Sequence, residues 1–508
     1  MKFKLILLTL ALMPLWSWAQ EVDIDYEAGM TTNVSSGKLA PYYIASNRGG
    51  TLTQKNSLLF NVGAKHDLDT TTRASFGFGA ELWAGMAASA TYDNYVDGKF
   101  IGHKERPANF WVQQLYAEGK YRSLFLTAGA KQHLSPIVNN DLSSGDLVYS
   151  TNSRPVMGLT AGFINFQNIP LTGGLLQIAG ELGYYKPFDK QWLENHYNYH
   201  SNFITTDYLL HYKNFYLRTK PDQPFVVTIG AQAASQFGGT AKEYFLGELT
   251  RTTHMHKDLK AFFRTIIAGK GGNGRGDFFV EGNHLGSWDI KLDYKLKQDA
   301  KLTAYYQSPW EDGSGIGKLN GFDGLWGLQF STGKQGIVED AVIEYIDLTN
   351  QGGPIHWAPK DHEGTHLVDQ STGADDYYNN YTYNGYQLLG MSIGSPMVKS
   401  PIYNLDGYMR YTDNRIRGFH AAMRGHFSTR LAYKLMGSFR RSWGTPFNPS
   451  VTPGDCTALS LELGYVPPVM NDALSIKAQA AMDRGNLYGK NNGIMLNITY
   501  HGNLTLKK

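Results

Sequence analysis

The sequence contains a single cysteine, Cys456, among its 508 residues. One cysteine cannot form an intramolecular disulfide, so an exported chain of this length must be held together by backbone pairing and packing. The sequence also lacks a strong charge, since its formal net charge of +3 falls to +1 once Lys2 and Lys4 leave with the N-terminal segment. This balance is unlike that of nucleic-acid-binding proteins, and we predict no nucleic-acid partner.

Beyond the N-terminus, the sequence has no apolar stretch long enough for a membrane-spanning helix, which needs about 20 residues. The N-terminal segment is typical of a secretory signal peptide: a basic start, an apolar core over residues 5–15, and small residues at Ser17 and Ala19. We predict cleavage after Ala19, so that residues 1–19 form the signal peptide. A permanent N-terminal anchor is the alternative, and the apolar run is too short to favour it.

The remaining chain alternates between apolar and polar residues with a period of two, which is typical of strands with one apolar and one polar face. In a membrane barrel, one face of each strand would meet lipid. The clearest apolar faces are Phe76, Phe78, Ala80 and Leu82; Phe225, Val227 and Ile229; Leu431, Tyr433, Leu435 and Phe439; Leu459, Leu461, Leu463 and Tyr465; Ile476, Ala478, Ala480 and Met482; and Ile494, Leu496, Ile498 and Tyr500.

Residues 20–508 show no linker or change in composition, so we predict one domain. A soluble β-sandwich also alternates, but it normally closes its core within about 250 residues. We therefore predict an all-β fold, a transmembrane antiparallel β-barrel of about 16–18 strands in the outer membrane of a Gram-negative bacterium. Short helices could fit in the loops or at the periplasmic mouth, over residues 358–374 or before Asn56.

Three short motifs look like chemical sites, and their surroundings argue against each. His362-Glu363-Gly364-Thr365-His366 has the zinc-protease spacing, but nearby prolines and glycines disfavour the helix that this motif requires. Gly269, Gly271 and Gly274 have dinucleotide-loop spacing, but an apparent strand follows where a helix is needed. His254 and His256 could share a metal, and a solvated loop is the simpler interpretation. We predict no catalytic residue, no metal and no cofactor.

Several segments resemble the Wzi-type capsule-assembly family, in the form found in Bacteroidetes-type bacteria. The segments that carry the resemblance are residues 281–289 (EGNHLGSWD), 306–315 (YQSPWEDGSG), 378–386 (YNNYTYNGY) and 394–396 (GSP), with support from residues 111–116, 126–129, 153–155, 414–418 and 440–445. Together these short motifs are spread over most of the chain after the signal peptide.

The resemblance implies an outer-membrane barrel with a largely obstructed lumen that acts as a surface lectin and helps fix exported polysaccharide to the cell. It implies outer-membrane lipid and capsular or other surface polysaccharide as partners, with capsule-export machinery as a further candidate. It supplies no set of ligand-contacting residues.

Candidate sugar-binding residues follow from chemistry, because flat rings stack on sugar faces and planar polar groups bridge hydroxyls. The candidates are Trp288 and Asp289; Trp310, Glu311 and Asp312; Tyr383, Asn384 and Tyr386; and Arg415 and Arg417. The two arginines could line the lumen wall and meet acidic sugars, or they could pair with carboxylates of the barrel. Structural roles remain open for the others, as interfacial aromatic rings or, at Asn384-Gly385, as a tight turn.

From the sequence we predict a non-catalytic barrel that binds or anchors surface polysaccharide. A passive diffusion channel for small solutes is the main alternative, and a membrane-embedded hydrolase is the second. Large steady conductance in a planar bilayer would favour the channel.

Overall fold

A computed structural model describes most of the chain after the N-terminal segment. The described residues are 22–96, 99–197, 202–269, 271, 280–311, 313–318, 320–352, 356–358, 370–372 and 375–506. The predicted signal peptide, Asp312, and the motif at residues 362–366 lie outside them, as does most of the glycine-rich stretch after Gly271.

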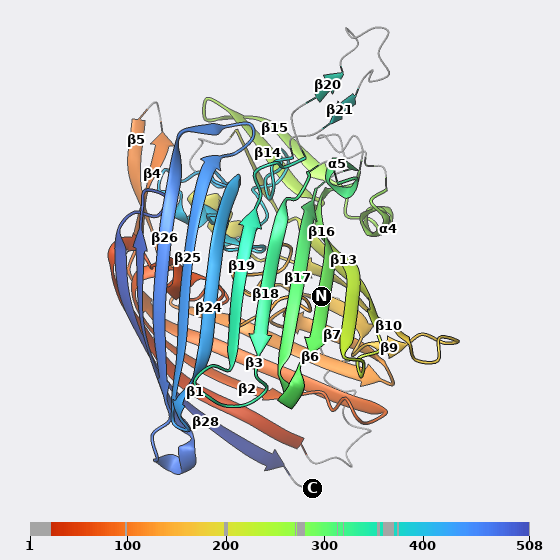
Figure 1. Cartoon of the computed structure of the whole chain (residues 1–508). Coiled ribbons are helices and arrows are strands. Elements are labelled where there is room, and N and C mark those ends of the chain that lie inside the picture. The colour runs from red at the N-terminus through yellow and green to blue at the C-terminus, as the bar shows by residue number, and fades with distance from the viewer. Residues whose placement is uncertain are drawn as a thin grey trace.

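The wall is a closed antiparallel β-barrel of 18 strands (Figure 1). The strands are β1 (Val22–Leu39), β2 (Gln54–His66), β3 (Ala74–Ala87), β6 (Phe110–Tyr121), β7 (Leu124–Ala130), β8 (Met157–Phe163), β10 (Leu176–Lys186), β12 (Leu209–Thr219), β13 (Phe225–Phe237), β16 (Asn283–Lys295), β17 (Lys301–Trp310), β18 (Gly324–Ser331), β19 (Asp340–Asp347), β24 (Ile416–Ser428), β25 (Leu431–Gly444), β26 (Pro449–Tyr465), β27 (Leu474–Arg484) and β28 (Asn491–Leu506). The short β9 (Gln167–Asn168) continues the line of β8 beside β10.

The first and last wall strands close the barrel. β1 pairs with β28 from Val22 opposite Leu506 to Ser35 opposite Gly493. Closure leaves no open edge, so each wall strand pairs with a neighbour on either side, as a membrane environment requires. The predicted fold class is therefore confirmed, with a strand number at the upper end of the expected range. The last strand extends beyond Tyr500, where the sequence pattern had placed its end, to Leu506.

The predicted apolar faces point outward. Leu459, Leu461, Leu463 and Tyr465 on β26 are 39–44% exposed, although they lie in the middle of a fully paired sheet. The alternate residues point into the barrel, and Ser460 and Glu462 are buried there. The outward side chains form the surface that lipid covers in a membrane, because lipid replaces water around this band.

The two ends of the barrel differ in the length of their connections. At one end, β6 and β7 are joined by residues 122–123 and β24 and β25 by residues 429–430. Most connections at the other end are long and carry the additional elements (Figure 1). In barrels of this class the short turns are periplasmic and the long loops extracellular, and we name the two ends accordingly.

The additional elements at the extracellular end are short. They are α2 (Tyr42–Ala45), β4 (Ala90–Val96), β5 (Lys99–Glu105), α3 (Lys190–His196), β11 (Phe203–Thr206), β14 (Gly239–Phe245), β15 (Glu248–Met255), α4 (Leu259–Ile267), α5 (Gly313–Ile316), β20 (His356–Ala358), β21 (Gln370–Thr372), β22 (Gln387–Leu388), β23 (Met391–Ser392) and a 3₁₀ turn at Pro401–Tyr403. Two further 3₁₀ turns, Lys297–Asp299 and Met470–Asp472, lie at the periplasmic end. No helix in the described ranges is long and apolar enough to cross a membrane.

The expected short helix before Asn56 is present as α2, although it lies inside the barrel and not at the periplasmic mouth. Residues 358–374 are described only in part. There, β20 and β21 form a two-stranded sheet where the sequence allowed a helix.

We expect Leu461→Arg to destabilise the barrel by roughly 2–4 kcal/mol, because a charge near the middle of the apolar band must leave water. The matched control is Val451→Arg, on an extension of the same strand where the side chain is fully exposed. Urea unfolding of both variants in lipid vesicles measures the difference. Equal stabilities would mean that Leu461 does not face lipid.

Candidate functional site

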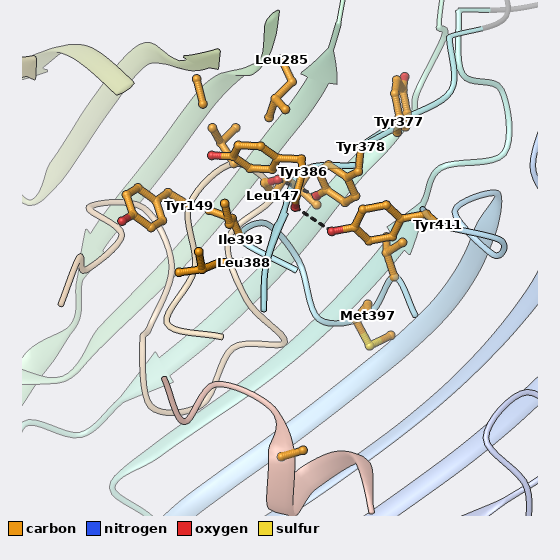
Figure 2. Packing of buried hydrophobic residues seen from close by; sticks show 14 of the residues in the cluster. Leu147, Tyr149, Leu285, Tyr377, Tyr378, Tyr386, Leu388, Ile393, Met397 and Tyr411 are labelled. Carbon is orange, nitrogen blue, oxygen red and sulfur yellow. Dashed lines mark hydrogen bonds between the residues drawn. The ribbon is translucent and has the colours of Figure 1, made fainter. Parts of the chain in front are cut away.

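Three segments from the extracellular end fold into the barrel and occupy part of its lumen. They are residues 40–53 between β1 and β2, residues 131–156 between β7 and β8, and residues 375–415 between β19 and β24. We call them together the plug. Their apolar side chains form one buried cluster with the wall, part of which Figure 2 shows around Tyr386.

A pair of carboxylates joins the middle plug segment to the wall strands β13, β16 and β17. Asp146 of the plug accepts hydrogen bonds from Gln232 Nε2 at 3.0 Å and Gln307 Nε2 at 2.8 Å. Asp289 of β16 shares both amides and accepts a third bond from Tyr216, at 2.7 Å. All of these side chains are buried. Two buried carboxylates that share donors are stable only when they are fully hydrogen-bonded. Because these hydrogen bonds join the plug to the wall, the network fixes the position of the plug.

A second anchor lies on β19 and β24. Glu344 accepts hydrogen bonds from Ser143 Oγ and the Ser144 amide, both at 2.6 Å, and from Tyr305 on β17. His420 of β24 bridges two plug segments, because one ring nitrogen lies 2.7 Å from the Leu142 carbonyl oxygen and the other 2.9 Å from Tyr43 Oη. The plug is thus attached to the wall at a second position around the barrel.

A third anchor joins α2 to β25, β26 and β27. Arg440 is fully buried, and its guanidinium lies 3.9 Å from the Tyr42 ring centroid and donates to the Met397 carbonyl. Arg48 donates to Glu462 at 2.9 Å and to Gln479 at 2.6 Å. Gln113 of β6, on another side of the lumen, donates to the Gly49 carbonyl at 2.9 Å.

The plug segments also bind one another. Asn152 donates to the Ser392 carbonyl at 2.9 Å, and Ser150 donates to the Gly394 carbonyl at 2.7 Å. Within the last segment, Tyr411 donates to the Tyr386 carbonyl at 2.7 Å (Figure 2). The three segments therefore form one body that spans the lumen.

Both ends of the last plug segment are held at the rim by one cluster. The Gln351 side chain donates to the Leu348 and Asn414 carbonyls, and Asp323 accepts hydrogen bonds from the Asn350 and Gln351 amides. Burial raises the pKa of Asp323 to about 6, against the effect of these bonds. The Asp323 carboxyl group therefore binds its proton more tightly in the folded state than in the unfolded state. Its contribution to the free energy of unfolding falls as the pH rises from 3.8 to about 6.

Cavities lie between the plug and the wall strands β1, β2, β3 and β28. One has a volume of about 430 Å³, and another, of about 800 Å³, shares Glu27, Glu81 and Gln114 with it. The larger cavity reaches Asp67 and Asn503 at the ends of β2 and β28. The smaller is rich in amides: Asn47, Asn61, Gln113, Gln114, Gln132, Asn140 and Asn497. This lining can hold water or a hydroxyl-rich ligand from the periplasmic side.

A cluster of rings and amides covers the opposite, extracellular side of the plug, and we call it the cap. Arg410 lies over two rings, at 5.5 Å from the centroid of Phe203 and 5.3 Å from that of Tyr408. It donates to Tyr408 Oη at 2.5 Å and to the Asn380 carbonyl at 3.4 Å. Tyr381, beside Asn380 in the chain, is 58% exposed. Phe203 is buried, whereas Tyr408 and Arg410 are half-buried. An accessible ring beside a guanidinium has the chemistry that sugar binding requires.

The adjacent residues Trp288 and Asp289 do not form one site. Trp288 is 43% exposed on the outer, lipid-facing side of β16, whereas Asp289 is buried in the lumen network. Neighbouring side chains on a strand point to opposite faces, so the wall separates them. Trp310 is half-buried against Gly286 and Gly315, and Glu311 accepts a hydrogen bond from the Tyr378 amide. Asp312 lies outside the described residues.

The predicted residues Tyr383, Asn384 and Tyr386 lie inside the plug, each at most 5% exposed. Asn384 bridges to β11 by donating to the Thr205 carbonyl at 2.8 Å. The interpretation of Arg415 and Arg417 as lumen-wall residues is wrong for Arg417, which points outward at the extracellular rim and pairs with Asp347 at 2.8 Å. Arg415 donates to the Thr349 carbonyl at 2.9 Å. The alternative of pairing with a barrel carboxylate describes Arg417 correctly.

Sequence reasoning missed the residues that hold the plug. Asp146 and Glu344 carried no recognisable motif, although Gln232 was on the polar face of its predicted strand. Within the described ranges, no group of three or more histidine, cysteine or acidic side chains could hold a metal. In the candidate pair at residues 254 and 256, His254 Nδ1 lies 3.1 Å from Thr240 Oγ1.

Comparison with known proteins finds similarity in structure alone. No protein-family model and no curated protein sequence matches the chain. Among solved structures, Wzi of Escherichia coli, described as a carbohydrate-binding β-barrel involved in group 1 capsule assembly, aligns with a TM-score of 0.53 and 13% identity over 93% of this chain and 83% of its own. Acinetobacter baumannii OccAB2 aligns with a TM-score of 0.48 and 11% identity, over 96% and 98%. Pseudomonas aeruginosa OccK5 aligns at 0.44 and 10%, over 96% and 99%.

We expect the wild-type barrel to conduct almost no ions in a planar bilayer, and the double variant Asp146→Ala/Glu344→Ala to open. Each hydrogen bond to a charged group contributes about 1.5–3 kcal/mol, so losing both anchors should release the middle segment. The control is Arg441→Ala, which removes an ion pair with Asp455 on the outer rim. If the folded double variant, verified by its heat-modifiable electrophoretic mobility, conducts no more than the control, these carboxylates do not hold the plug closed.

Proposed function

We propose that this protein is exported with residues 1–19 as its signal peptide and resides in the outer membrane of a Gram-negative bacterium. There it binds surface polysaccharide and anchors it to the cell without covalent chemistry. The observation that carries the proposal is the plug, which occupies the lumen and is hydrogen-bonded to wall strands at several positions around the barrel.

A plug of this kind favours binding over transport. A diffusion channel needs a continuous water-filled path, whereas here three segments are joined to the wall and to one another by buried hydrogen bonds. A large polymer outside the cell meets the extracellular end of the barrel first. Its binding surface should therefore lie on the outer side of the plug or on the rim.

The cap provides such a surface. Tyr381 and Tyr408 can stack on the apolar faces of sugar rings, and Arg410 can bridge hydroxyls or bind the carboxylate of an acidic sugar. The cap keeps the 378–386 segment of the sequence-based proposal but transfers the contact from the buried Tyr383, Asn384 and Tyr386 to the exposed Tyr381. Trp310 and Glu311, at the end of β17, remain candidates at its margin.

The likeness to the Wzi structure is consistent with this proposal, because that barrel is described as carbohydrate-binding and as involved in capsule assembly. The likeness concerns the fold, so the polymer class comes from the chemistry of the cap. A capsule-type polysaccharide, neutral or acidic, fits that chemistry. We also propose capsule-export machinery as a partner in the attachment of surface polysaccharide.

We expect Tyr408→Ala and Arg410→Ala each to weaken polysaccharide retention by about fivefold, since a stacked ring or a guanidinium contact is worth about 1 kcal/mol. Retention of purified folded barrel on an array of neutral and acidic polysaccharides measures the change. Arg73 and Tyr121 form a matched pair at the periplasmic end, with Arg73 donating to Tyr121 Oη at 2.6 Å and lying 5.3 Å from its ring. Their alanine variants are the control and should bind as the wild type does.

Two outcomes would contradict the proposal. One is that no polysaccharide on the array retains the wild-type barrel. The other is large steady conductance of the wild type, which would favour a diffusion channel. In the native host, deletion of the gene should increase the share of polysaccharide that is shed from the cell.

A further inference from the structure

We infer that α4 and the lysines beside it form a docking surface for a phosphorylated lipid of the outer leaflet. Three observations support this inference: where α4 lies, which side chains it exposes, and the positive charge around it.

Helix α4 lies against the outer face of the wall, not over the lumen. Tyr185 of β10 contacts the plug through Tyr149, so its neighbour Tyr184 points outward. Tyr184 donates to the Phe262 carbonyl at 2.7 Å, and its ring packs against the Phe262 ring at 4.7 Å. Figure 1 shows α4 outside the barrel near the extracellular ends of β13 and β16.

Both ends of α4 are fixed. At its N-terminus, the Asp258 side chain accepts a hydrogen bond from the Ala261 amide at 2.8 Å. At its C-terminus, Lys213 of β12 donates to the Ile266 carbonyl, and Ala268 adopts the left-handed conformation that often ends a helix. These caps set the rotation of the helix, so the side chains that it exposes are fixed as well.

The exposed side of α4 is apolar. Leu259, Phe263 and Ile267 recur at every fourth position and are 79%, 68% and 76% exposed, whereas Ala261 and Thr265 on the opposite side are buried. The same outer surface continues toward the periplasm through Phe215, Ile229 and Trp288, which are 43–50% exposed. The apolar stripe of α4 is therefore an extension of the lipid-facing band to the level of the outer-leaflet headgroups.

A positive cluster lies next to this stripe. Lys186 and Lys190 each lie 3.1 Å from a carboxylate oxygen of Asp207, and Lys257 donates to the Asp207 carbonyl at 3.2 Å. Three lysines thus contact Asp207, two through its carboxylate and one through its backbone carbonyl, and Lys260 on α4 is also exposed. Exposed lysines at the edge of an apolar stripe complement a lipid with acyl chains and phosphate groups, because each end of the lipid meets matching chemistry.

A binding measurement tests this docking surface with lipid A, which carries phosphates and acyl chains, and with the same lipid stripped of its phosphates. Purified full-length barrel in neutral detergent is titrated with each, and bound lipid is counted by native mass spectrometry. We expect the phosphorylated form to bind at least tenfold more tightly. Equal binding of the two forms would overturn the proposal, as would saturation by zwitterionic phospholipid.

Two sets of variants assign the binding to this surface. Lys190→Gln/Lys257→Gln/Lys260→Gln should lose roughly tenfold or more in affinity for lipid A, whereas Lys297→Gln/Lys334→Gln/Lys490→Gln, with the same change in charge elsewhere, should lose almost none. Phe263→Ser/Ile267→Ser should weaken binding of both lipid forms. Equal effects of the two lysine sets, or unchanged binding by the serine variant when its heat-modifiable mobility shows a folded barrel, would refute the surface.

Discussion

The pairing of β1 with β28 is the constraint on which the rest of the molecule depends. In lipid, every backbone amide and carbonyl must be satisfied within the protein, and a sheet meets that condition only when its edges join. Closure over 18 strands then creates an interior too wide to be filled by wall side chains alone. The chain must leave this space to water or fill it with other parts of itself. Here the plug occupies part of the lumen, and cavities remain between it and the wall.

Beside its apolar packing, the plug makes many polar contacts with the wall, because the inner face of the wall is itself partly polar. The alternation that places leucines toward lipid places Gln232, Gln307 and Glu344 toward the lumen. A plug segment that enters this space must satisfy those groups, because an unpaired buried polar atom costs about 1–3 kcal/mol. Asp146 and the serines at residues 143 and 144 meet that need. The inward polar pattern and the plug therefore specify each other.

The wall could be predicted from the sequence because its signal is local. Each run such as Leu459, Leu461 and Leu463 reports its own strand, and the lengths of the strands and turns limit their number. The plug could not be predicted in the same way, because its residues follow no period and its partners lie far away in sequence. Asp146 meets Gln307 across 161 positions, and Tyr43 meets His420 across 377. Only the obstructed lumen that the family resemblance implied pointed toward it.

The candidate site was harder to predict than the fold, and Trp288 with Asp289 illustrates the reason. Adjacency in a strand places two side chains on opposite faces, so residues that look like one site in the sequence are separated by the wall. The tyrosines of residues 377–386 were the better signal, but burial divides them, and Tyr381 alone among the three at 381, 383 and 386 is exposed. Composition singled out the segment, whereas only the packing of the plug distinguishes the ring that faces outward from the rings that hold the segment together.

The two ends of the barrel offer different chemistry to a ligand, and the plug lies between them. Were the lumen continuous, the amide-lined cavities near Glu27 and Glu81 and the rings of the cap would belong to one path. The plug lies between the cap, at the extracellular end, and the larger cavity, which reaches Asp67 and Asn503 at the periplasmic end. Binding at one end can influence the other only through the plug itself, whose anchors at Asp146, Glu344 and Arg440 are buried and shared with the wall.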